Sequence, residues 1–147
     1  TFATVERRFA RRAAEAGRRI DVGEGGGIEL RADLLRLDQA IGTLVDNALR
    51  YGAGTIVLSG RRADDGTVEI HVTDEGEGFS PEFLPRAFER FSRAPGVRDG
   101  GSGLGLAIVA TVAEAHGGAA HAANRPAGGA DVRLVIPLSS SFKQGDG

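Results

Sequence analysis

The sequence contains no cysteine, and this absence excludes three kinds of chemistry. A chain without cysteine forms no disulfide framework, no thiolate metal site and no thiol nucleophile. The sequence also lacks any apolar run that approaches the roughly 18 residues needed to cross a bilayer. No charged and then apolar leader precedes the first helical pattern, so we expect an excised fragment without a secretory signal. A cytoplasmic setting is compatible with these absences.

The net charge of −2 is small, which argues against a general nucleic-acid binder. Hydrophobic residues make up 41% and charged residues 26% of the chain, and these fractions exclude a disordered or collagen-like chain. At 147 residues the chain is long enough for a single domain that buries about 70% of its unfolded surface. Six arginines are concentrated in residues 1–20, where they indicate a solvated helix face.

Hydrophobic residues recur at helical spacing in three segments. These segments are residues 1–19, the stretch from Leu34 to Ala48, and residues 104–116. The first pattern continues to Ile20. Asp33 can cap the second segment and Gly52 stops it, while the third opens directly out of a glycine-rich run. We therefore expect three helices.

Four runs rich in β-forming residues predict two hairpins. They cover residues 55–60, 67–73, 119–124 and 131–137. Residues 79–101 show no sustained period, so we expect a lid at about 79–103. The order of these elements predicts an α/β fold, a two-layer sandwich with helices on one face of a mixed sheet, formed by residues 1–147 as one domain.

The second predicted helix carries polar side chains beside its apolar stripe. Thr43, Asn47, Arg50 and Tyr51 share one face. The amide oxygen of Asn47 can ligate a hard cation such as Mg²⁺, and Arg50 can neutralise phosphate charge. The alternative is an asparagine and an arginine on an ordinary surface.

Residues 74–78 read DEGEG and follow the second predicted strand. Asp74 continues the alternation of Val68, Ile70 and Val72, so its carboxylate should point to the buried side. A buried carboxylate needs a donor, and the exocyclic amino group of adenine is one. Glycines at 76 and 78 would let the backbone approach a flat ring. The alternative is a surface turn.

Residues 100–109 read GGSGLGLAIV and run into the third predicted helix. Unpaired backbone N–H groups and the positive end of the helix dipole make such a segment a phosphate cradle. The segment lacks the Gly-Lys-Ser/Thr ending of a P-loop and the spacing of a dinucleotide-binding loop. The alternative is a hinge.

Taken together, NALRY at 47–51, DEGEG at 74–78, FERF at 88–91 and GGSGLGLAIV at 100–109 resemble the ATP-binding catalytic domain of sensor histidine kinases. The wider family includes gyrase, the MutL repair protein and the ninety-kilodalton heat-shock chaperone. The resemblance implies a Bergerat-type fold, in which about three helices cover one face of a mixed sheet.

The resemblance also implies roles for individual residues. Asn47 and Arg50 would be the catalytic residues, with Asn47 holding Mg²⁺ and Arg50 reaching the phosphates in place of the family's usual lysine. Tyr51 would border the nucleotide, and Asp74 would accept the adenine amino group. The remaining nucleotide-binding residues would be Gly76 and Gly78 beside adenine, and Gly101, Gly103, Leu104, Gly105 and Leu106 at the phosphate end.

Thr43 occupies the position where gyrase, MutL and the chaperone carry a glutamate that serves as general base. Threonine has no useful basicity near neutral pH, so the resemblance favours phosphotransfer to histidine over hydrolysis. None of His71, His116 and His121 resembles the family's acceptor motif. The acceptor is therefore expected on a separate phosphoacceptor domain of the same protein.

The resulting hypothesis is a histidine kinase domain that binds Mg-ATP and donates the γ-phosphoryl group to that external histidine. A response regulator would be served downstream, and the fragment would be the cytoplasmic part of a membrane-anchored bacterial protein. We expect no contact of this fragment with nucleic acid or membrane. The alternatives are an ATP-hydrolysing conformational switch and a catalytically silent nucleotide-binding scaffold that docks a partner through its arginine-rich first helix.

Overall fold

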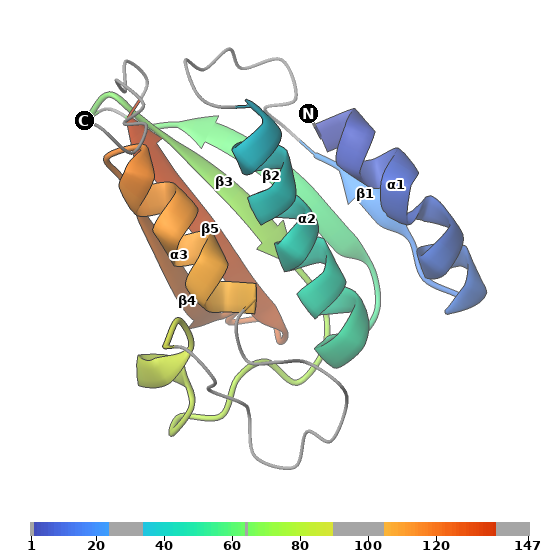
Figure 1. Cartoon of the computed structure of the whole chain (residues 1–147). Helices are drawn as coiled ribbons and strands as arrows, with labels where there is room; N and C mark the ends of the chain where they lie inside the picture. Colours follow the sequence, from blue (N-terminus) through green and yellow to red (C-terminus); the bar gives the residue numbers. More distant parts are fainter. Residues whose placement is uncertain (1, 24–33, 64, 90–104, 138–147) are drawn as a thin grey trace.

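The computed structural model describes residues 2–23, 34–63, 65–89 and 105–137. Its three α-helices lie on one face of a sheet (Figure 1). They are α1 (Phe2–Glu15), α2 (Leu34–Tyr51) and α3 (Gly105–Ala115), and a short 3-10 helix, η1 (Leu84–Arg86), follows the third strand. None of the helices in the described part of the chain combines the length and the apolar character of a membrane span.

The sheet has five strands in the order β1-β2-β3-β5-β4. They are β1 (Ile20–Val22), β2 (Ile56–Arg62), β3 (Thr67–Thr73), β4 (Ala119–Asn124) and β5 (Ala130–Pro137). Strand β1 pairs with β2 in parallel, whereas the other three pairs are antiparallel. The predicted two-layer α/β sandwich with a mixed sheet and three helices is therefore confirmed.

The predicted first helix at residues 1–19 is too long, and the assignment of Ile20 to its apolar pattern was wrong. Helix α1 ends at Glu15, and Ile20 lies in β1 opposite Ile56. The helix closes with a Schellman motif, in which Gly17 has φ +69° and the N–H of Arg18 donates to Ala13 O at 2.8 Å. Ile20 is buried because it belongs to the sheet, so its helical spacing from the earlier apolar residues is incidental.

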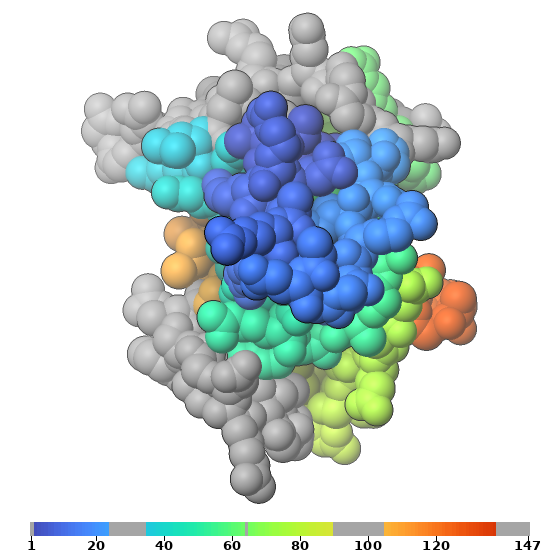
Figure 2. All heavy atoms as spheres, turned by 90° about the vertical axis from the view of Figure 1, so that its right-hand side faces the viewer, coloured from blue at the N-terminus to red at the C-terminus, as the bar shows by residue number. Residues whose placement is uncertain are grey.

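The core lies between the helices and the sheet. Val68, Ile70 and Val72 of β3 are buried, as their alternation predicts. Helix α1 contacts α2 and β1. Figure 2, which views the molecule from the right-hand side of Figure 1, shows α1 in dark blue on the surface. The largest fully buried side chains come from both layers and include Ile41, Leu44, Ile56, Leu58, Leu134 and Ile136.

The first part of the expected lid packs on this core. Phe83 is buried, and its ring stacks on that of Phe79 with 5.7 Å between centroids. Phe88 also packs against the core. Residues 79–89 therefore form a packed turn around η1, and the remainder of the expected lid lies outside the described residues. The proposed cap Asp33 lies outside them as well.

Candidate functional site

The residues expected to bind a nucleotide gather at one end of the sandwich. The C-terminal end of α2, the N-terminal end of α3 and the segment that follows β3 meet there (Figure 1). Helices α2 and α3 are in contact, and a Cβ atom added at Gly105 would lie 3.3 Å from Cγ2 of Thr43. The face of α2 that carries Thr43 thus lies against the beginning of α3.

Asp74 is the buried carboxylate of this end, with 5% of its surface exposed. Its Oδ1 accepts hydrogen bonds from the N–H of Gly76 at 2.8 Å and from the N–H of Ala130 at 3.4 Å. Within the described part of the chain, no donor is bonded to Oδ2. The carboxylate points to the buried side as predicted, and one of its two oxygens keeps its capacity to accept a hydrogen bond.

Two glycines make room for this carboxylate. A Cβ atom at Gly52 would lie 2.5 Å from Cγ and 2.6 Å from Oδ2 of Asp74. A Cβ atom at Gly76 would lie 2.9 Å from the backbone nitrogen of Ala53. Both distances are too short for a real side chain, so the glycines let the end of α2 approach Asp74 closely. Gly52 also closes α2, because its N–H donates to Ala48 O at 2.9 Å.

The polar face of α2 ends beside this carboxylate. Asn47 is half-buried, and its side chain forms no hydrogen bond with another described residue. Arg50 donates from Nε to Asp46 Oδ2 at 3.1 Å, and Oδ1 of Asp46 binds Arg12 of α1 at 2.7 Å. Tyr51 is 41% exposed. The amide of Asn47 is therefore available to a ligand, whereas Arg50 is held by an ion pair on its own helix.

The expected phosphate end is described only in part. Gly105 begins α3 and is half-buried, while the Leu106 side chain belongs to the hydrophobic core. Gly101, Gly103 and Leu104 lie outside the described residues. Among the residues that the structure does describe, no group of three or more His, Asp and Glu side chains could hold a metal ion.

Asn124 and Arg125 contact the segment after β3 and were missed from the sequence. Asn124 binds the backbone of Phe79 through both polar atoms of its side chain, and Arg125 donates to Asp74 O at 2.7 Å. These contacts join residues 45 and 51 positions apart. The composition RPAGG signals only a turn, so nothing in the local sequence indicates this contact.

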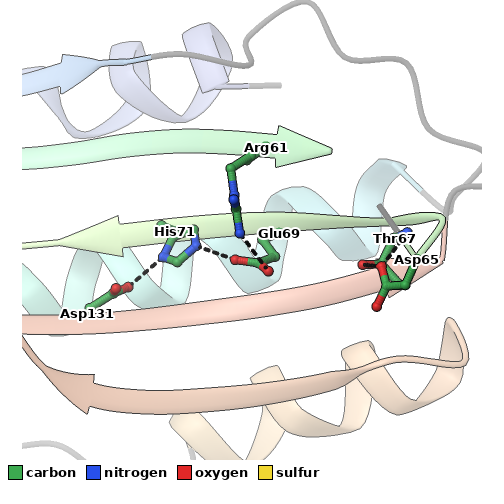
Figure 3. A network of polar contacts seen from close by, with 6 residues as sticks. All are labelled: Arg61, Asp65, Thr67, Glu69, His71 and Asp131. Carbon is green, nitrogen blue, oxygen red and sulfur yellow. Dashed lines mark hydrogen bonds and ion pairs between the residues drawn. The ribbon is translucent and has the colours of Figure 1, made fainter. Parts of the chain in front are cut away.

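The histidines have separate surroundings. His71 lies on β3 with Nδ1 2.7 Å from Asp131 and Nε2 3.0 Å from Glu69 (Figure 3). The hydrogen bond to Asp131 raises the pKa of His71, and the bond from His71 lowers the pKa of Glu69. His116 is buried with Nδ1 2.8 Å from Val112 O, whereas His121 is exposed.

Comparisons of sequence and structure with known proteins identify relatives of this chain. The family described as "Histidine kinase-, DNA gyrase B-, and HSP90-like ATPase" matches residues 32–140. The chain is 49% identical over 102 residues to "Sensor histidine kinase component HK1" of Mycobacterium tuberculosis, covering 69% of this chain and 60% of that protein.

Two solved structures are similar over almost the whole chain. The mycobacterial sensor histidine kinase MprB has a TM-score of 0.83 and 29% identity, with 95% of this chain and 94% of that chain covered. Full-length ShkA, in complex with AMPPNP, has a TM-score of 0.81 and 30% identity. The match covers 97% of this chain and 30% of the ShkA chain. The chain thus spans 60% of HK1 and 30% of ShkA.

Proposed function

Because this chain belongs to the family of histidine kinase-, DNA gyrase B- and HSP90-like ATPases, we propose that it transfers phosphoryl groups from Mg-ATP to a histidine of a separate phosphoacceptor domain. The sensor histidine kinases among its relatives and the AMPPNP complex of ShkA support this proposal. The observation that carries it is Asp74, a buried carboxylate with one oxygen bonded to backbone N–H groups and the other left for a ligand.

Asp74 would select adenine. The exocyclic amino group of adenine is a donor, and Oδ2 is an acceptor beside the end of α2. Guanine carries a carbonyl oxygen at the corresponding ring position, so a carboxylate would meet an acceptor there instead of a donor. Gly76 and Gly78 shape the same wall, and Tyr51 borders it. The site should therefore bind ATP in preference to GTP.

Asn47, Arg50 and the beginning of α3 would hold the phosphates. Mg²⁺ bound through the amide oxygen of Asn47 would neutralise phosphate charge, and it prefers such oxygen ligands. Arg50 would have to leave or share Asp46 in order to reach a phosphate. The proposed phosphate end comprises Gly105 and Leu106 of α3 together with Gly101, Gly103 and Leu104 of the proposed lid at 79–103.

Thr43 favours histidine as the acceptor over water. Its hydroxyl donates to Gln39 O at 2.9 Å within α2, so its proton is already engaged by the helix backbone. A threonine cannot take a proton from water near neutral pH, whereas an imidazole nitrogen needs no such help before it attacks a phosphoryl group. The chain would therefore position the nucleotide and leave the nucleophile to its partner.

The partner we propose is the phosphoacceptor domain of the same protein, with a response regulator downstream. The chain spans only part of the relatives HK1 and ShkA, which leaves room for that domain elsewhere in the full-length protein. The whole protein would be a membrane-anchored sensor with this domain on the cytoplasmic side.

The test is transfer of radioactive γ-phosphate from Mg-ATP to the purified phosphoacceptor domain. We expect the label on the acceptor, little label on this chain, and loss of transfer in Asn47→Ala. The control is Arg61→Ala, because Arg61 is exposed on β2 and paired only with Glu69 among the described residues. Steady phosphate release without an acceptor, abolished by Asn47→Ala, would contradict the proposal and favour a hydrolysing switch. Acceptor binding without transfer would instead favour the scaffold.

A further inference from the structure

The turn between β4 and β5 contacts both ends of the Asp74 loop, by which we mean residues 74–79. Asn124 lies at the end of β4 and reaches the far end of the loop at Phe79, while Arg125 reaches its near end at Asp74. Neither residue lies next to the loop in sequence. The tertiary fold therefore places this turn against the Asp74 loop, where its side chains form hydrogen bonds with both ends of the loop.

Asn124 binds Phe79 with two hydrogen bonds. Its Oδ1 accepts from the N–H of Phe79 at 2.7 Å, and its Nδ2 donates to the carbonyl of Phe79 at 2.9 Å. The contact also requires Gly78, which has φ +78°, because a Cβ atom there would overlap Oδ1 of Asn124. One amide side chain thus uses both its donor and its acceptor to hold the end of the loop.

Arg125 and Gly129 hold the other end. The guanidinium of Arg125 donates to the carbonyl oxygen of Asp74 at 2.7 Å. The backbone of Arg125 and Gly129 closes the turn at 2.8 Å, and Gly129, with φ +99°, lies so close to Asp74 that a Cβ atom would overlap the Asp74 carbonyl. Ala130 completes the contact, because its carbonyl accepts from the N–H of Asp74 at 3.1 Å and its own N–H donates to Oδ1 of Asp74 at 3.4 Å.

These contacts leave Oδ2 as the one polar atom of Asp74 that no described residue binds. We propose that Asn124 and Arg125 are positioning residues that fix the Asp74 loop so that Oδ2 meets the nucleobase, and that they thereby set the affinity and selectivity for adenine. This inference rests on the proposed function. Asn124 is exposed and Arg125 is half-exposed, so neither side chain fills the core. Their loss should alter the site more than it alters stability.

The test compares nucleotide binding in Asn124→Leu, Asn124→Asp and Arg125→Ala with the parent chain. Asn124→Leu removes both hydrogen bonds, whereas Asn124→Asp keeps the acceptor and loses the donor. We expect Asn124→Leu and Arg125→Ala to weaken ATP binding by about tenfold and to narrow the preference for ATP over GTP. The ATP affinity of Asn124→Asp should lie between that of Asn124→Leu and that of the parent. Arg61→Ala is the matched surface control and should bind as the parent does.

A second measurement needs no nucleotide. Hydrogen exchange at residues 76–79 should become faster in Asn124→Leu than in the parent, while the melting temperature changes no more than it does in Arg61→Ala. Unchanged exchange, or unchanged ATP affinity and selectivity in a parent chain that binds ATP, would overturn the role of Asn124. Failure of the parent to bind ATP would instead overturn the proposed function and, with it, the selectivity that depends on it.

Discussion

At the level of single residues, Asp74 shows how strand alternation can place a carboxylate on the buried side of a sheet. Its position after β3 places the carboxylate on the side where Val68, Ile70 and Val72 are buried. A buried carboxylate costs several kcal/mol if it is unpaired. Backbone N–H groups offset that cost at Oδ1 only. The backbone therefore satisfies one carboxylate oxygen of Asp74, and the other keeps its capacity to accept a hydrogen bond.

His71 makes the stability of the fold depend on pH. Its side chain is 19% exposed, and the bonds to Asp131 and Glu69 raise its pKa above the ordinary value of 6.5. A raised pKa in the folded state means that this contribution is fully present below pH 6.5 and is lost as the pH rises through the higher, folded value. The charged imidazole thus stabilises the sheet at pH values below its raised, folded-state pKa.

We therefore expect His71→Gln to reduce the free energy of unfolding most at about pH 6 and least at about pH 9. The measurement is urea denaturation of the parent and the variant at both pH values. His121→Gln is the control, because His121 is exposed. An effect of His71→Gln that grows toward pH 9 would contradict the assignment of a charged imidazole.

At the level of elements, Arg18 links the end of α1 to the end of α2. Its guanidinium donates to Gly54 O at 2.8 Å and to the carbonyls of Ala48 and Leu49 at 3.2 Å. The last carbonyls of a helix have no partner within the helix and carry the negative end of its dipole. Arg18 therefore caps α2 where it approaches Asp74.

Replacing Arg18 by methionine should lower the free energy of unfolding by about 1–3 kcal/mol, because several carbonyls lose a charged donor. Urea denaturation measures this loss. Arg19→Met is the control, since the exposed pair of Arg19 with Asp21 should contribute less than about 1 kcal/mol. Equal losses in both variants would show that Arg18 does not cap α2.

Some helices and strands can be predicted from hydrophobic periodicity alone, and others cannot. The three α-helices and strands β2, β3 and β5 follow from apolar spacing and from glycines at their ends, because each of them buries one face. Strand β1 has three residues, too few for a period, and it exists because β2 offers an edge in parallel. The turn that contains η1 is likewise held by tertiary packing of Phe79 and Phe83.

For the whole molecule, the sequence predicts the layers and the position of Asp74 but not the contacts between distant segments. Asp74 is predictable because strand alternation is local. The hydrogen bonds of Asn124 with Phe79 and the ion pair of Arg12 with Asp46 depend on how α1, α2 and the β4–β5 turn meet in space. The ion pair of Arg50 with Asp46 is local, because the two residues lie four positions apart on α2. The spacing along α2 indicates which side chains share a face, but it does not indicate which of them already have a partner.

The measurement that tests the central claim most directly is calorimetric titration of Mg-ATP and Mg-GTP into this chain and into Asp74→Asn. The amide in the variant can keep an oxygen toward the Gly76 N–H while it presents a donor where the adenine amino group would bind. We expect the parent to bind ATP and not GTP, and the variant to lose at least about tenfold in ATP affinity. Equal binding of both nucleotides, or ATP binding by Asp74→Asn as tight as by the parent, would contradict recognition of adenine by Asp74.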